Sequence, residues 1–205
     1  MSDITTTAAT TAALTLADAK RHLNVSSTAD DTYIGDLVTA ATDMLEARCN
    51  RCFVTQTRKL TMDSFNDSRY VHTDTRRSQA RTIFPRRSPV KSVSSITYVA
   101  TSGTTTTISS SDYVVSTGDS PARITEGLGA TWPVTYGDAN DVVVTYVAGH
   151  STVSTGVPGR VKQAIRMLVG HWYRNREAVL QGTISKEIEL SLDALLESEQ
   201  VEQYG

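Results

Sequence analysis

The residues best suited to chemistry are two cysteines and four histidines. Cys49 and Cys52 form a Cys-x-x-Cys motif. Redox motifs of this kind open a helix, where the helix dipole lowers the pKa of a thiol, but this pair closes a predicted helix, where the dipole raises it. The histidines, at positions 22, 72, 150 and 171, are scattered singly and give no zinc-ligand spacing. We interpret both cysteines as structural, with a metal or redox role as the less favoured alternative.

Signatures of common enzymes do not occur in the sequence. Gly149-His150-Ser151 lacks the second glycine of a nucleophile elbow, and there is no HExxH pair, P-loop or dinucleotide fingerprint. In 171–173, a His-Trp-Tyr run, three consecutive helical residues point in three directions, so we favour core packing with an exposed flank over a ligand or partner site. The sequence predicts a protein that is not an enzyme, with no catalytic residue, metal site or cofactor.

Composition indicates an ordinary globular chain. Its 205 residues are 39% hydrophobic and 20% charged, with a net charge of -2. This length suits one core, or a core with an inserted subdomain. The net charge by itself indicates neither a nucleic-acid nor a membrane partner, and no apolar run approaches the ~20 residues of a membrane helix. Because the N-terminus also lacks the pattern of a secretory signal, we expect a soluble protein that is intracellular when made.

Helical periodicity flanks a central region of strands. Thr15 is a candidate N-cap, a longer helix follows Asp30 and Asp31 and stops near Asn50, and a third apolar stripe follows Pro158. Between them, period-two patterns predict strands beginning near 53 and at 92–100, 104–108, 112–116, 122–125 and 141–148. The predicted class is α+β: a small helical bundle core with an inserted, mainly antiparallel β subdomain and an extended C-terminal tail. The expected parts are a flexible arm at 1–14, helical core at 15–52 and 151–181, the β subdomain at 53–150, and a tail at 182–205.

The tail is apolar and acidic at once. Its six acidic residues, of which Glu189 and Glu197 are two, stand against one lysine. Even spacing predicts a strand first, and a short helix follows a cap at Ser191. These apolar side chains either fold back on their own domain or dock on a partner, and we favour docking because the core looks complete without them. The docking residues predicted are Ile184, Ile188, Leu190, Leu192, Leu195 and Leu196.

A basic segment runs from residue 76 to residue 91 without any Asp or Glu. A solvated loop and strand edge is the favoured interpretation; contacts with acidic surfaces of neighbouring subunits and with DNA phosphates remain alternatives. Phe84 is its one aromatic residue, so base stacking has little support. The alternative function is therefore a DNA-binding module that uses Arg76, Arg77, Arg81, Arg86, Arg87 and Lys91.

The order of these segments resembles a known family. Residues 15–23 followed by Asp30-Asp31 resemble the opening of the head-tail connector proteins of long-tailed bacteriophages. Residues 85–98 look like that family's central strand block, Trp132-Pro133 like one of its turns, 142–149 like its last strand and 157–178 like its closing helix. The likeness is collinear over roughly residues 15–196, and the Cys-x-x-Cys motif is not part of it.

The resemblance implies a structural protein of the virion neck, also called an adaptor or head-completion protein. Copies would form a ring, usually a dodecamer, beneath the portal protein of the DNA-filled head. The ring would extend the channel for genomic DNA and present its far face to the next neck or tail-completion protein. The tail would reach into the portal. Such a protein is made in the host bacterial cytoplasm and has no membrane partner.

Overall fold

The computed structural model describes residues 2–66, 71–74, 80–176 and 186–201, which form helices and antiparallel sheets and confirm the α+β class. The chain divides into two compact units. The helical unit comprises residues 9–54 and 150–200, and the sheet unit comprises residues 1–8, 55–149 and 201–205. The chain therefore passes between the units after residues 8, 54, 149 and 200. Within the described residues, no helix is long and apolar enough to cross a membrane.

The helical unit is built from α1 (Leu16–Leu23), α2 (Asp31–Cys49), α3 (Gly159–Arg174) and α4 (Lys186–Leu196), with short turns η2 (Ser154–Gly156) and η3 (Glu197–Glu199). The predicted ends of the first two helices are confirmed. The Thr15 hydroxyl accepts a hydrogen bond from the Asp18 backbone N–H at 3.1 Å, as an N-cap does. Asn50 ends α2 with a left-handed φ of 53°, a conformation that asparagine tolerates better than most residues.

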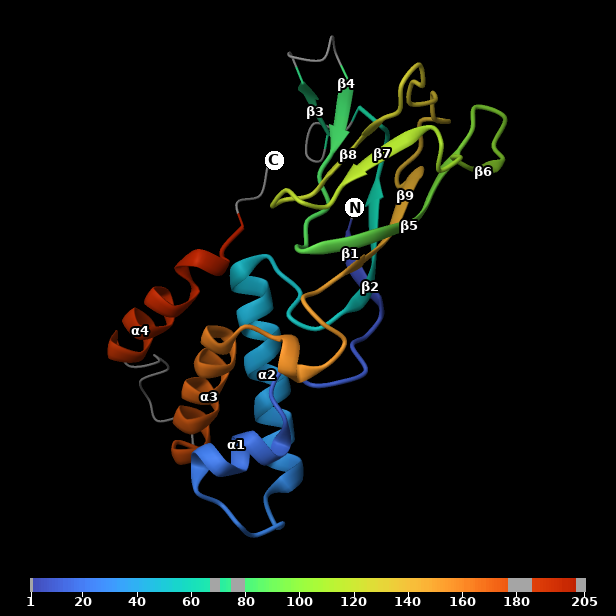
Figure 1. Cartoon of the computed structure of the whole chain (residues 1–205). Helices are drawn as coiled ribbons and strands as arrows, with labels where there is room; N and C mark the ends of the chain where they lie inside the picture. Colours follow the sequence, from blue (N-terminus) through green and yellow to red (C-terminus); the bar gives the residue numbers. More distant parts are fainter. Residues whose placement is uncertain (1, 67–70, 75–79, 177–185, 202–205) are drawn as a thin grey trace. The chain divides into compact units, whose positions relative to one another are not determined.

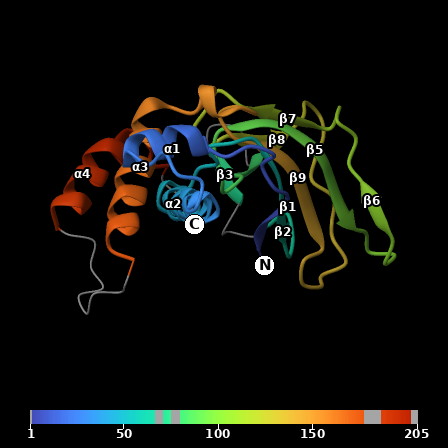
Figure 2. The same ribbon diagram turned by 90° about the horizontal axis from the view of Figure 1, so that it is seen from below.

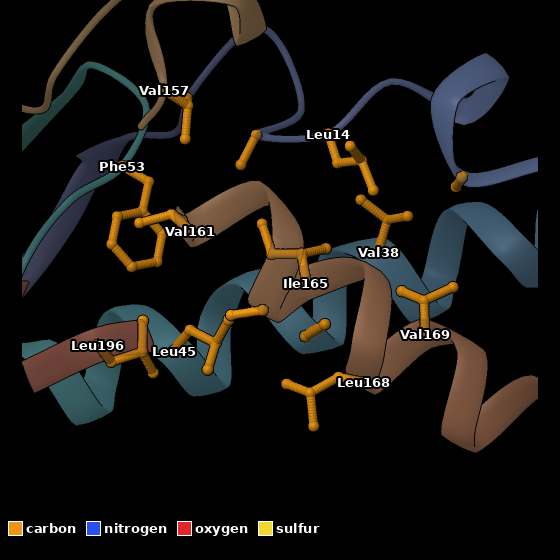
Figure 3. Packing of buried hydrophobic residues seen from close by; sticks show 14 of the residues in the cluster. Leu14, Val38, Leu45, Phe53, Val157, Val161, Ile165, Leu168, Val169 and Leu196 are labelled. Atoms are coloured by element: carbon orange, nitrogen blue, oxygen red, sulfur yellow. The ribbon is translucent and has the colours of Figure 1, made fainter. Parts of the chain in front are cut away.

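One apolar cluster joins all four helices (Figure 3). Leu45 of α2, and Ile165 and Leu168 of α3, are fully buried in it. Leu196 of α4 belongs to the same cluster, and Figure 3 shows its side chain beside Leu45. Burying a leucine or isoleucine side chain contributes roughly 1.5–3 kcal/mol, so these contacts stabilise the association of the helices.

The sheet unit contains two antiparallel sheets, seen from two directions in Figures 1 and 2. The five-stranded sheet has the order β1-β2-β9-β5-β6, and its strands are β1 (Asp3–Thr7), β2 (Gln56–Met62), β9 (Val142–Ala148), β5 (Val90–Val99) and β6 (Thr105–Thr107). The four-stranded sheet has the order β3-β4-β8-β7, with β3 (Val71–Asp74), β4 (Ala80–Ile83), β8 (Arg123–Glu126) and β7 (Tyr113–Ser116). Most of these strands match the predicted ones, but the β3–β4 hairpin does not appear in the prediction.

The last strand, β9, is the centre of the five-stranded sheet. It pairs along its whole length with β2, from Gln56 opposite Ala148 to Met62 opposite Val142, and with β5 on its other side. Val142, Val144 and Tyr146 are buried on one face, whereas the residues between them are half-buried. A strand that is apolar on both faces is typical of this central position.

The N-terminal residues differ from the expected flexible arm, because Asp3–Thr7 form the edge strand β1. Asp3 holds this strand in place through its carboxylate. One oxygen accepts a hydrogen bond from Arg58 Nε at 2.8 Å, and the other accepts one from the Tyr146 hydroxyl at 2.6 Å. Arg58 and Tyr146 are buried, so the strand is anchored by a buried ion pair although its threonine-rich sequence carries almost no apolar signal.

Candidate functional site

The most specific functional prediction from the sequence concerns the tail, and the observed secondary structure of this segment differs from the predicted one. Residues Lys186–Leu196 form one helix, α4, so the strand predicted before Ser191 is wrong for the described part of the tail. Ile188 and Leu192 are four residues apart, a spacing that fits a helix as well as the alternation of a strand. The leucine, lysine and glutamate residues of this segment favour the helix. Ile184 lies outside the described residues.

One face of α4 lies on the helical unit itself, beside α3 in Figures 1 and 2. Leu192 and Leu196 are fully buried in the apolar cluster, and Ile188 and Leu195 are partly buried against it. Arg48 of α2 forms an ion pair with Asp193 next to this contact. The premise that these side chains have no place in their own subunit is therefore wrong for Leu192 and Leu196.

The opposite face of α4 is open to solvent. Leu190 is 62% exposed, and Glu189, Asp193 and Glu197 are exposed at successive intervals of four residues, one helical turn apart. The helix thus shows an acidic stripe with one large apolar side chain beside it. Of the six predicted docking residues, Leu190 is the one whose side chain remains available on the described surface.

The predicted basic site is distributed over several elements. Arg81 belongs to β4 and is half-buried, and Lys91 belongs to β5 and is exposed. Arg86 is exposed and Arg87 is half-buried in the turn between these strands, where both have interactions within the chain. Arg76 and Arg77 lie outside the described residues. Contact of this segment with DNA or with an acidic partner stays a prediction.

The two cysteines have the surroundings of a structural pair. Both cysteines are buried, and neither forms a disulfide. Burial, followed by the negative charge of Glu199, raises the pKa of the Cys49 thiol to about 11. Because reactive thiols have lowered pKa values, this environment is the reverse of a redox motif. Within the described residues, no three His, Cys, Asp or Glu side chains form a group that could hold a metal ion.

A cluster that the sequence prediction missed joins the start of α2 to the end of α3. Asp30 accepts hydrogen bonds from the Tyr173 hydroxyl at 2.6 Å and from Arg176 Nη2 at 2.7 Å. The Arg176 guanidinium also lies 4.7 Å from the ring centre of Tyr173 and 4.9 Å from that of Tyr33. The hydrogen bond from Tyr173, followed by the one from Arg176, lowers the pKa of Asp30. These partners are far apart in the sequence, so no local pattern could have indicated them.

The sheet unit presents a second open feature, a groove of about 570 Å³ lined by residues of β5, β6 and the 128–133 loop. The loop is held firmly at its base. Trp132 stacks on Phe65 with ring centres 4.9 Å apart, and its indole N–H donates to the Arg81 carbonyl at 2.9 Å. Leu128 nevertheless projects fully into solvent at the rim of this groove. A single exposed leucine of this kind is ordinary on a protein surface and does not by itself indicate a contact.

Comparison with known proteins identifies the family to which the chain belongs. A family model described as "Head completion protein" matches residues 12–187. The chain belongs to the head completion protein family. A search of curated proteins found no match for this head completion protein.

Solved structures share the whole fold of the head completion protein. A chain from the neck of an empty gene transfer agent particle, computed with C6 symmetry, has a TM-score of 0.76 and 20% identity. A chain from the virion of the native particle has a TM-score of 0.75 and 19% identity, and one from the native neck computed with C12 symmetry has 0.72 and 20%. Each comparison covers 98% of this chain and 96% of the other. The structural alignments therefore extend beyond the family match, which ends at the second residue of α4.

Proposed function

We propose that this head completion protein is a structural subunit of the neck of a phage-like particle, where copies form a ring that joins the head to the tail. The family match over residues 12–187 carries the proposal. The origin of the similar folds supports it, because they come from the necks and virion of gene transfer agent particles. The twelve-fold symmetry applied to one of those necks supports a dodecamer for this chain as well. The family membership favours a structural role over a catalytic one.

The proposed partners follow from the position of a ring in a neck. The portal protein of the head lies on one side, the next neck or tail-completion protein lies on the other, and genomic DNA passes through the channel. A closed ring requires head-to-tail contacts, in which each subunit uses two different surfaces for its two neighbours. The subunit is made in the bacterial host and resides in the virion at the junction of head and tail.

We assign the portal contact to the exposed face of α4. The inner face is occupied by the apolar cluster of the subunit itself, so it is not free for a partner while the tail is seated. The outer face offers Leu190 as an apolar anchor and the exposed carboxylates of Glu189 and Glu197 as charged surroundings, whereas Asp193 already pairs with Arg48. A partner with an apolar pocket and basic residues around it fits this face.

Electron cryo-microscopy of intact particles that carry this protein tests the ring. The expected density is a closed ring of this fold between the portal and the tail. Particles whose neck contains no copy of this chain would contradict the proposal, and a ring with a copy number other than twelve would correct the dodecamer alone.

A matched pair of substitutions tests the docking face. Leu190→Glu places a charge at the proposed apolar anchor, so we expect at least a tenfold loss of attachment to portal-containing heads, equal to about 1.4 kcal/mol for one hot-spot residue. Val153→Glu is the control, because Val153 is a 48% exposed apolar residue of the same unit. Both variants should keep the thermal stability of the parent protein. Full head attachment by Leu190→Glu, measured by co-sedimentation, would remove α4 from the portal contact.

A further inference from the structure

Glu199 is a buried carboxylate at the end of the tail, and its side chain is only 2% exposed. It lies in η3, directly after α4. One carboxylate oxygen accepts a hydrogen bond from Arg160 Nε at 2.6 Å. The other lies 3.4 Å from Arg51 Nε and 3.8 Å from His150 Nε2. Arg51 Nε also donates to the Glu199 backbone carbonyl at 2.5 Å, so both the side chain and the backbone of this residue are held.

The three partners of Glu199 come from the segments through which the chain enters and leaves the helical unit. Arg51 follows α2 and precedes the departure of the chain after residue 54. His150 is the first residue of the helical unit on the return from the sheet unit, and Arg160 lies in the first turn of α3. Glu199 itself precedes the last departure, after residue 200.

These connecting segments also bind one another. The Phe53 backbone N–H donates to the Glu46 carboxylate at 2.6 Å, and the His150 N–H donates to the Phe53 carbonyl at 3.3 Å. Val54 and Ser151 form an isolated parallel bridge. The outgoing and returning segments are therefore paired, and the Glu199 carboxylate lies against both of them through Arg51 and His150.

The cost of burying the Glu199 charge links the position of the tail to the connecting segments. A buried charge is tolerated only while its partners remain in place, and loss of one partner leaves an uncompensated charge. When α4 leaves its seat, Glu199 leaves with it, and two arginines lose their buried counter-ion. The paired segments at 51–54 and 150–151 then lose the carboxylate that lies between Arg51 and His150.

We propose that Glu199 couples the seating of α4 to the order of the segments that connect the two units. A partner that draws the tail away would loosen residues 51–54 and 150–151, and a partner that orders those segments would favour the seated tail. The two effects are reciprocal, as thermodynamic coupling requires. This goes beyond the proposed function and does not depend on it, because the coupling is a property of the isolated chain.

Hydrogen exchange on the full chain in solution tests the coupling. Glu199→Gln removes the charge and keeps the shape of the side chain, and Glu197→Gln is its control, an exposed glutamate two residues earlier in the same turn. In Glu199→Gln we expect the amides of α4 and those of Phe53 and His150 to exchange at least about tenfold faster, the effect of losing one charge-assisted hydrogen bond. In Glu199→Gln, the amides of α1 should exchange at the same rates as in the parent protein. In Glu197→Gln, all of these amides should exchange at the parent rates.

Two results would overturn the proposal. One is faster exchange in α4 of Glu199→Gln with parent rates at Phe53 and His150, since the tail would then move without the connecting segments. The other is an equal response of Glu199→Gln and Glu197→Gln. Should Glu199→Gln fail to fold, Leu192→Ala decides the matter, because it weakens the seat of α4 without altering any group around Glu199. Parent rates at Phe53 and His150 in that variant, with α4 exchanging faster, would equally refute the coupling.

Discussion

The seating of α4 on its own subunit is open to a direct test with two leucines of the same helix. Leu192 is fully buried in the apolar cluster, whereas Leu190 is 62% exposed. Substituting each with alanine removes the same atoms from the same helix and changes helix propensity equally. The two variants therefore differ in burial alone.

The expected magnitudes differ severalfold. Leu192→Ala removes buried atoms and leaves a cavity, which costs about 2–5 kcal/mol in a well-packed core. For a chain of this size, about 3 kcal/mol corresponds to a fall in Tm of roughly 6–12 °C. Leu190→Ala should stay within about 0.5 kcal/mol of the parent protein, as surface substitutions do. The loss of stability in Leu192→Ala cannot exceed the free energy that holds α4 on the helical unit. If the cavity costs more than this free energy, α4 detaches instead of staying packed over the cavity.

Thermal and urea denaturation followed by circular dichroism at 222 nm measures both variants, because the helices dominate that signal. Hydrogen exchange of the α4 amides then distinguishes a cavity in a seated helix from detachment of the helix. Equal stabilities for Leu192→Ala and Leu190→Ala would mean that the inner face of α4 is not packed in the free subunit. The original expectation from the sequence, a tail without a place in its own core, would then be restored.

Two further predictions concern buried polar groups. Asp3→Ala should lower the free energy of unfolding by about 3–5 kcal/mol, because the buried Arg58 loses its carboxylate counter-ion, whereas Thr7→Ala in the same strand should have little effect in urea denaturation. The raised pKa of Cys49 means that the unfolded chain loses this proton at lower pH than the folded chain does. Its contribution to stability is therefore complete below pH 9 and disappears as the pH rises through about 11, so in a reducing buffer Cys49→Ala should lose less stability over that interval than the parent protein. An identical pH dependence for the two proteins would contradict the burial of that thiol.

Local signals explain which parts of the fold were predictable. The N-cap at Thr15 and the stop at Asn50 depend on the residues next to them, so the first two helices were found at their correct ends. Strands with period-two patterns, such as β5 and β9, were found for the same reason. The family resemblance, confirmed by the family match, depended on the order of several such segments rather than on any single one.

The sequence-based predictions are wrong where contacts between distant residues determine the structure. The β1 strand is held by Asp3 through partners 55 and 143 residues away, and its threonines give no local indication of pairing. The β3–β4 hairpin lies in a charged stretch, and β4 pairs with β8, where Thr82 lies opposite the distant Thr125. The burial of Leu192 depended on whether α2 and α3 leave room for another helix, which no pattern within the tail can reveal. Glu199 is one of several acidic residues in the tail sequence, and only its distant arginine partners show that it is buried.

The position of β9 in the middle of its sheet determines when the chain can fold during translation. β9 lies between β2 and β5, so these two earlier strands emerge from the ribosome without the neighbour that separates them. The helices α1 and α2 remain without their packing partner α3 for longer still, because α3 follows β9 in the chain. The sheet core is therefore completed only after β9 has emerged, and the helical core only after α3 and α4 have, through the slow pairing of distant segments. A nascent chain that still lacks these later elements therefore cannot present a finished subunit surface to another copy.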